Sequence, residues 1–132
     1  MLNRGVVIVR AKQPFLDWAR ITKERFQGLA IWPTNVMGVN INDFASQNRL
    51  PAIYPTRGYM DVGGLMSYST NTEEVNRRIA TYIDRILKGA KPADLPVEQP
   101  TKYDLVINLK EARAIGLTIP SSLLLRADKV IE

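Results

Sequence analysis

Residues 63–132 read GGLMSYSTNTEEVNRRIATYIDRILKGAKPADLPVEQPTKYDLVINLKEARAIGLTIPSSLLLRADKVIE. The stretch decides the fold because the spacing of its apolar residues changes along the chain from that of strands to that of a helix and back. Residues 65–68 and 103–107 are short apolar runs of the kind found in buried strands. Between them, apolar residues recur at helical spacing from Val75 to Leu87. Strands and helices in alternation predict an α/β layered architecture with a mostly parallel sheet.

A helix is expected over residues 72–88, because its ends carry the usual signals. Thr70 or Asn71 can cap its start, acidic residues occupy its first turn, and Gly89 can end it in the left-handed conformation. Its apolar side chains share one face, formed by Val75, Ile79, Tyr82, Ile83, Ile86 and Leu87. A stripe of this kind has to be covered by another element.

Downstream of that helix, residues 91–100 hold three prolines and predict an extended connector without helix. Asn108 starts a short helix that ends at Gly116. Ser121 or Ser122 caps a last helix that is expected to run to about Lys129.

Upstream, the same reasoning gives alternating elements. Val6 to Arg10 is a β-branched run, and Phe15 to Phe26 carries an imperfect helical stripe after Pro14. Residues 29–32 and 52–54 are expected as buried strands. Any helix between them is confined to about residues 42–47, because the surrounding segment is rich in asparagine and is broken by Gly38.

The order of several short motifs resembles a known family. These are GGLMSY at 63–68, KGAKPADLPVEQPTK at 88–102, LVINL at 105–109, GLTIP at 116–120 and RAD at 126–128, followed by VIE at 130–132. They resemble the carboxyl end of ABC transporter substrate-binding proteins. RLPAIYP at 49–55 still matches this family, residues 29–48 match loosely, and residues 1–28 match nothing recognisable.

The resemblance implies a type I periplasmic-binding fold, in which two Rossmann-like lobes sandwich a small ligand such as an amino acid. Members are about twice as long as this chain, so it is expected to form a partial, three-layer lobe of such a protein. We divide the chain into a basic leader of unknown origin, residues 1–28 with one strand and one helix, and a family segment, residues 29–132. The helix over 72–88 would normally pack on the lobe that is absent here, so its apolar face is expected to lack cover unless the leader or another chain supplies it.

The net charge of +5 is concentrated in the leader. Residues 1–28 hold six basic and two acidic residues, whereas the rest of the chain holds 12 and 11. A basic arm can bind nucleic acid or an anionic membrane. Here the charges alternate with apolar residues, which favours the solvated face of a strand and a helix, and no aromatic residues are placed for base stacking. No nucleic acid partner is expected.

The composition argues against an enzyme. The chain has no cysteine and no histidine, which removes thiolate nucleophiles and the commonest general base and transition-metal ligand. Neither a phosphate-binding loop nor a nucleophile elbow is present. We expect no catalytic residue, no metal and no cofactor.

Ligand-binding residues are expected beyond the carboxyl ends of the strands, where loops converge in open α/β sheets. Arg57 can hold a carboxylate through two parallel hydrogen bonds, while hydroxyl groups orient a ligand and tyrosine rings stack on it. Two alternatives stay open: Arg57 can pair with Asp61 at the surface, and Tyr54 can belong to the core. The predicted ligand-binding set is Tyr54, Thr56, Arg57, Tyr59, Ser67, Tyr68 and Asn71.

Two positions depart from the family pattern. Gly58 and Tyr59 stand where an acidic and an aromatic residue usually follow the arginine, and Ser69 replaces the glycine of the usual MSYG. Serine reaches positive φ less easily than glycine, so both changes affect loops that would touch a ligand.

The sequence gives two different expectations for where the protein is located in the cell. The resemblance implies a periplasmic protein, whereas the apolar run GVVIV is interrupted at once by Arg10 and Lys12 and is too short for a signal peptide. As encoded, the chain is therefore expected to be cytoplasmic.

These observations lead to a functional hypothesis: the chain is the solute-binding component of an ABC transporter, or a truncated fragment of one. Its partners would be a small carboxylate such as an amino acid and, in complete relatives, a permease. The alternative is a cytoplasmic effector-binding or protein-interaction module of the same fold. Self-association through the face that holds Val75, Ile79, Ile83 and Ile86 is a further expectation. Because a cleft needs two walls, the chain alone is expected to bind amino acids weakly or not at all.

Overall fold

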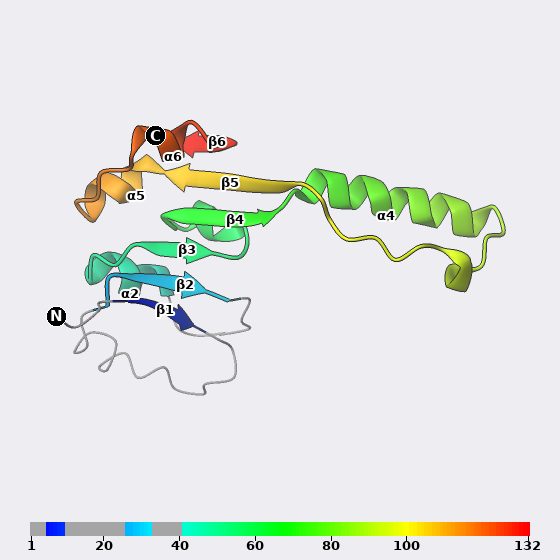
Figure 1. The fold of residues 1–132 in the computed structure, drawn as a ribbon, viewed down its shortest axis with the longest axis horizontal. Helices are drawn as coiled ribbons and strands as arrows, with labels where there is room; N and C mark the ends of the chain where they lie inside the picture. The colour runs from blue at the N-terminus through cyan, green and yellow to red at the C-terminus, as the bar shows by residue number, and fades with distance from the viewer. Residues whose placement is uncertain (1–4, 10–25, 33–40) are drawn as a thin grey trace.

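The structure, a computed structural model, describes residues 5–9, 26–32 and 41–132. Six described strands form one sheet in which spatial order follows chain order. Figure 1 shows this sheet as a stack of arrows from β1 to β6. The strands are β1 (Val6–Val9), β2 (Gly28–Ile31), β3 (Ala52–Tyr54), β4 (Met66–Thr70), β5 (Tyr103–Asn108) and β6 (Lys129–Ile131).

Helices connect the strands from β2 to β6. The described helical elements are α2 (Ile41–Gln47), α3 (Gly58–Asp61), α4 (Thr72–Leu87), α5 (Leu109–Ala114), α6 (Ser121–Leu124) and the 3₁₀ turn η1 (Pro92–Asp94). None of the helices in the described ranges is long and apolar enough to span a bilayer. The helix expected over residues 15–26 and the break expected at Gly38 lie outside the described residues.

Neighbouring strands are parallel except β4 and β5, which pair antiparallel. The prediction of a mostly parallel α/β sheet is therefore confirmed. Because β5 runs against β4, the end of β4 and the start of β5 lie on the same side of the sheet, together with the ends of β1, β2 and β3. We call this side, with residues 32, 55–57, 70–71 and 102–103, the arm edge.

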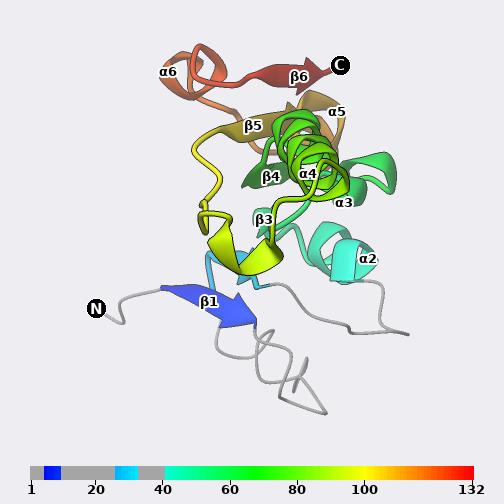
Figure 2. The ribbon, with the colours of Figure 1, turned by 90° about the vertical axis from the view of Figure 1, so that its right-hand side faces the viewer.

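The sheet carries a core on each face. Val106 and Ile107 are consecutive on β5, so their side chains point to opposite faces. Val106 packs with residues of α2 and α3, whereas Ile107 packs with Ala112 of α5 and with Ile119 before α6. In Figure 2, α2 and α6 lie on opposite sides of the sheet. The result is the three-layer arrangement that the sequence predicts.

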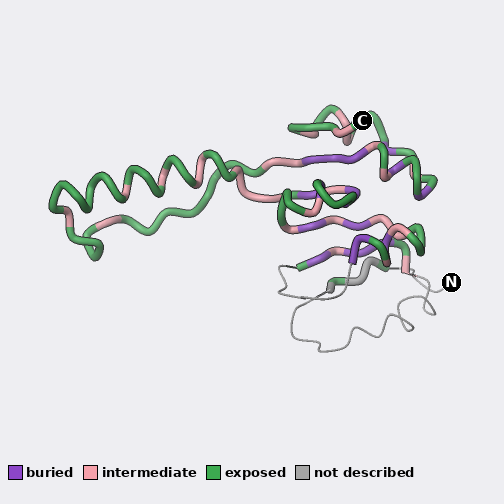
Figure 3. The backbone as a smooth tube through the Cα atoms, turned by 180° about the vertical axis from the view of Figure 1, so that it is seen from behind, coloured by how far each residue is buried: buried purple, intermediate pink, exposed green. Residues whose placement is uncertain are grey.

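One segment projects away from this body. α4 leaves the sheet after β4, and residues 88–102 run back beside it to β5 (Figure 1). We call residues 71–102 the arm. The hydroxyl of Tyr82 donates to the backbone oxygen of Pro96 at 2.7 Å, and Arg78 pairs with Glu98, so the returning connector is fastened to the helix. No residue of α4 is buried, and Figure 3 shows the whole arm in the colours of exposed and intermediate residues.

The residues predicted to cap or end α4 and α5 do so in the structure. The side chain of Asn71 accepts a hydrogen bond from the backbone N–H of Glu74 at 2.8 Å, and that of Asn108 accepts from Glu111 at 3.2 Å. Gly89 follows α4 with φ 99°. These contacts start α4 and α5 and end α4 at the predicted places, because each depends only on residues a few positions apart.

Two predictions for the segments after α4 are wrong. The last helix ends at Leu124 rather than near Lys129, and residues 129–131 form β6 instead. Asp128 explains the change, because its backbone N–H donates to the carbonyl of Leu105 and its carboxylate accepts from the N–H of Leu105. These bonds hold the segment alongside β5. The connector also contains a short 3₁₀ turn, η1, which begins at a proline.

Candidate ligand-binding site

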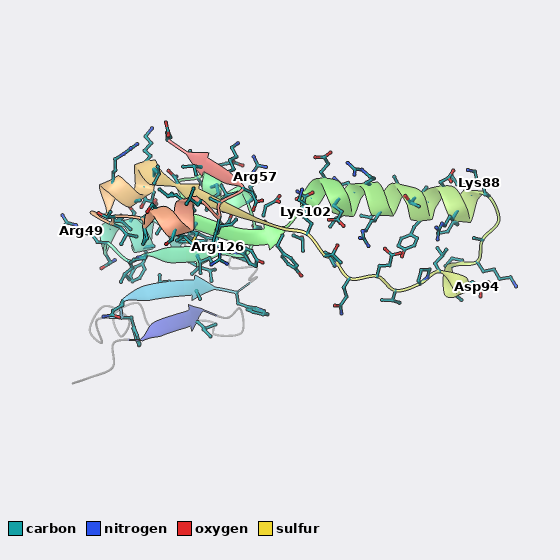
Figure 4. The ribbon with its side chains drawn as sticks, turned by 45° about the horizontal axis from the view of Figure 1, so that its top comes forward. Arg49, Arg57, Lys88, Asp94, Lys102 and Arg126 are labelled. Carbon is teal, nitrogen blue, oxygen red and sulfur yellow. The ribbon has the colours of Figure 1, made fainter. Side chains whose placement is uncertain are left out.

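The arm edge gathers polar and aromatic side chains from several elements. Trp32 follows β2, Thr56 and Arg57 follow β3, and Tyr103 begins β5. In Figure 4, Arg57 and Lys102 lie at the end of the sheet from which the arm departs, while Arg49 lies at the opposite end. The edge is the place where a ligand would meet the ends of the strands.

Thr56 and Arg57 are two of the predicted site residues that are open to solvent. Both are exposed, and Arg57 immediately precedes α3. Arg57 forms no ion pair with any described residue, Asp61 included. Its guanidinium is therefore available to a carboxylate, and the alternative pairing with Asp61 is absent from the structure.

Tyr54 and Tyr59 meet each other beneath the surface. Tyr54 is buried in the core, and its ring stacks on that of Tyr59 with centroids 4.7 Å apart and planes 20° from parallel. Burial raises the pKa of the Tyr54 hydroxyl, and the charge of Glu111 adds to this effect. Tyr54 is thus a neutral core residue, as the alternative from the sequence held, and Tyr59 is its half-buried partner between core and edge.

Ser67 does not reach the arm edge. It lies opposite Tyr54 in the register of β3 and β4, is fully buried, and its hydroxyl has no hydrogen-bond partner among the described residues. The pleat explains this, because consecutive residues of β4 point to opposite faces and Ser67 points into the core. Ser67 is therefore not accessible to a ligand in this structure.

Tyr68 and Tyr103 form an aromatic pair near the arm edge. Their rings stack with centroids 5.4 Å apart and planes 17° from parallel, and the two side chains are 54% and 44% exposed. Tyr68 was predicted from the sequence, whereas Tyr103 was missed. An exposed stacked pair offers a flat surface on which an apolar or aromatic ligand can rest.

Asn71 is occupied by contacts within the protein. Its Oδ1 accepts from Glu74, its Nδ2 donates to both carboxylate oxygens of Asp104, and its backbone N–H donates to Lys102. These bonds join the start of α4 to the end of the returning connector and to the start of β5, at the point where the arm meets the sheet. Asn71 therefore fixes the arm edge in position instead of offering a free amide to a ligand.

Trp32 was also missed by the sequence reasoning. It is 62% exposed directly after β2. The rule that selected the residues after β3 applies equally to the residue after β2, so this signal was present in the sequence. Tyr103 could be recognised only from the antiparallel pairing of β5, which brings its first residue to the same edge.

The described residues of the arm edge offer groups that can bind a small carboxylate. A guanidinium, a hydroxyl and aromatic rings recognise a carboxylate with an apolar body. Within the described ranges, no group of three His, Cys, Asp or Glu residues could hold a metal ion. The edge is also one-sided, because the described residues supply a single wall next to the exposed arm.

Comparison with protein families gives a match over most of the chain. Residues 22–131 match the profile of the ABC transporter substrate binding protein family. The chain belongs to this family, whose members are binding proteins rather than enzymes. A comparison with curated proteins finds no match.

Solved structures give the same fold. The ABC domain from Streptococcus pneumonia, in complex with L-Trp, superposes with a TM-score of 0.76 at 20% identity over 97% of this chain and 56% of that one. A conserved domain protein from Vibrio cholerae gives 0.77 at 20% identity, with 96% and 54% covered. The ligand-free, open form of a substrate binding protein with adhesive properties from Clostridium difficile gives 0.64 at 14% identity, with 97% and 54% covered. The chain thus spans about half the length of these structures, roughly one lobe.

Proposed function

We propose that this chain supplies one wall of the ligand site in the solute-binding component of an ABC transporter, and that the ligand is an amino acid. Family membership supports the class of function. The observation that carries the choice of ligand is the arm edge, which holds the exposed Arg57 and the partly exposed, stacked rings of Tyr68 and Tyr103. The guanidinium would hold the α-carboxylate, and the rings would face the side chain.

An aromatic amino acid fits this surface best. The stacked rings of Tyr68 and Tyr103 are 54% and 44% exposed, so a planar side chain could rest on them without displacing core residues. The ligand named for the Streptococcus pneumonia structure, L-Trp, is of this kind. We propose L-tryptophan as the first compound to test.

The affinity of the chain by itself would be low. A site of this type encloses most of the ligand surface, and here the described residues enclose one side only. In a type I carrier the opposite lobe closes over the ligand, and the closed form then docks on a permease. By the same resemblance, we propose a periplasmic location for the carrier and an ABC permease as its partner.

The test is an NMR titration of the isotope-labelled full chain with L-tryptophan. Shifts concentrated at the arm edge, and lost in Arg57→Gln, would support the proposal. Arg49→Gln is the matched control, because Arg49 is exposed at the opposite end of the sheet and should leave the titration unchanged. Shifts that are absent, or that are unaffected by Arg57→Gln, would contradict the proposed site.

The exposed apolar face of α4 favours a second candidate, an effector-binding or protein-interaction module that acts inside the cell. Fractionation of the native host separates the two. Recovery of the protein outside the inner membrane supports the carrier, while retention in the cytoplasm supports the module.

A further inference from the structure

The helix α3 is too short to hold its own position, although the placement of Arg57 depends on it. It has a single turn, Gly58–Asp61, and begins where the backbone N–H of Met60 donates to the carbonyl of Arg57 at 2.8 Å. One helical turn is not stable by itself, because nucleating a helix costs more than its first hydrogen bond returns. The elements packed against α3 therefore decide where Arg57 stands.

Two contacts hold α3 to the sheet side of the molecule. The ring of Tyr59 stacks on that of Tyr54, which is buried on β3. After the helix, the backbone N–H of Gly64 donates to the carbonyl of Tyr59 at 2.7 Å. These contacts fix α3 relative to β3 and to the turn that leads into β4. They leave open how α3 is held relative to α2, which lies on the same side of the sheet (Figure 2).

Asn42 of α2 supplies that further contact. Its Nδ2 donates to the carbonyl of Val62 at 3.1 Å and, more weakly, to that of Tyr59 at 3.4 Å. The residue is buried, with 6% exposed, and its Oδ1 has no hydrogen-bond partner among the described residues. Because both partners are carbonyl oxygens, the amide must present its N–H groups to the end of α3.

Asparagine at this position opposes two general preferences. It is a poor helix former, and a buried polar atom without a partner costs free energy that an apolar side chain would not. The other buried positions of α2, Ile41 and Ala45, are apolar. Departures of this kind are expected where a residue serves a site. The bonds from Asn42 to the end of α3 thus point to a role in the placement of the segment that carries Arg57.

We propose that Asn42 is a positioning residue for the ligand site. Its amide holds the end of α3, and through α3 it sets where the guanidinium of Arg57 meets a carboxylate. The inference rests on the proposed role of Arg57 in binding an amino acid. Asn42 itself is buried, so its effect on a ligand passes through residues 57–62 rather than through direct contact.

The first test is native-state amide hydrogen exchange of the full chain, followed by NMR without ligand. In Asn42→Ala, the amides of Met60 and Gly64 should exchange at least about tenfold faster, as expected when a buried hydrogen bond is lost and the segment opens locally. The amide of Asn108, which donates to the carbonyl of Leu65, should keep its rate. Unchanged rates at Met60 and Gly64, or an equal rise at Asn108, overturn the proposal.

Two control variants separate positioning from stability. Asn48→Ala removes an amide that also donates to a backbone oxygen, that of Phe44 at 2.8 Å, but this bond is exposed and lies at the end of α2 itself. Ala45→Gly weakens α2 through the low helix propensity of glycine and leaves the Asn42 amide in place. Neither control should speed the exchange of Met60 and Gly64 relative to Asn108.

The second test is the NMR titration of these variants with L-tryptophan. Asn42→Ala should weaken binding at least about fivefold, because a guanidinium–carboxylate pair depends on close placement of both groups. Asn48→Ala and Ala45→Gly should leave the dissociation constant within about twofold of the parent value. Binding by Asn42→Ala as tight as by the parent chain, or equal weakening by Ala45→Gly, overturns the proposal.

The two tests distinguish a failure of this inference from a failure of the proposed function. If the parent chain gives no shifts with L-tryptophan, the proposed function is contradicted, and the ligand part of the inference falls with it. The exchange rates still decide whether Asn42 holds α3. If the parent chain binds and the exchange rates do not respond to Asn42→Ala, the inference fails and the proposed function stands.

Discussion

The side-chain amide of Asn71 donates to both carboxylate oxygens of Asp104, at 3.0 Å and 2.8 Å, while its oxygen accepts from the backbone N–H of Glu74 at 2.8 Å. One residue thus caps α4 and ties the start of the arm to β5. Because β4 and β5 are neighbours only through their antiparallel pairing, this contact fixes where the arm meets the sheet.

Replacement of Asn71 by alanine should lower the free energy of unfolding by about 1 to 3 kcal/mol, since it removes a helix cap and a hydrogen bond to a charged group. Urea unfolding followed by circular dichroism measures the change. Asn71→Asp separates the two roles, because it keeps the capping oxygen but places a second carboxylate beside Asp104. If Asn71→Ala is as stable as the parent chain, the contact does not hold the arm.

The stability of the chain should fall at high pH because of Tyr54. Burial raises the pKa of its hydroxyl above 10.0, so the folded chain holds this proton more tightly than the unfolded chain. The stability that this raised pKa contributes is fully present below pH 10. It is lost as the pH rises from 10 towards the pKa of Tyr54 in the folded chain. Urea unfolding at several pH values should show a steeper loss in the parent than in Tyr54→Phe. Parallel curves for the two proteins would contradict the burial of this hydroxyl.

Gly64 is a position where any side chain should be costly. A Cβ there would lie 2.7 Å from the backbone oxygen of Tyr59 and 2.6 Å from Met60. Gly64→Ala should therefore destabilise the chain by about 1 to 3 kcal/mol, the usual range for overpacking. Gly58→Ala is the control, because nothing lies within 4 Å of its added Cβ and the residue is helical. Thermal unfolding of both variants checks the difference, and a smaller loss for Gly64 than for Gly58 would refute it.

The sequence predicted the elements whose signals are local. The start of α4 at Thr70 or Asn71, its end at Gly89 and the start of α5 at Asn108 depend on residues within one turn, and the structure agrees, with Asn71 as the cap of α4. β6 was missed because three residues become a strand only by pairing with β5, a contact between distant parts of the chain. α3 was missed because it has a single turn.

The candidate site was predicted in part for a similar reason. The rule that ligands bind beyond the carboxyl ends of the strands selected Thr56 and Arg57, which are exposed at the arm edge. It could not decide which face of β4 each residue occupies, so it included Ser67, whose side chain points into the core. It also could not show that the amide of Asn71 is already bonded to Asp104, or that Tyr103 stacks on Tyr68.

Isothermal titration calorimetry of the full chain with the twenty amino acids, L-tryptophan first, tests the central claim that this lobe provides one wall of a two-walled site. The account predicts weak binding, with a dissociation constant above about 10 μM, which corresponds to roughly −7 kcal/mol. A dissociation constant below that value for any amino acid would contradict it, because the chain would then enclose its ligand unaided.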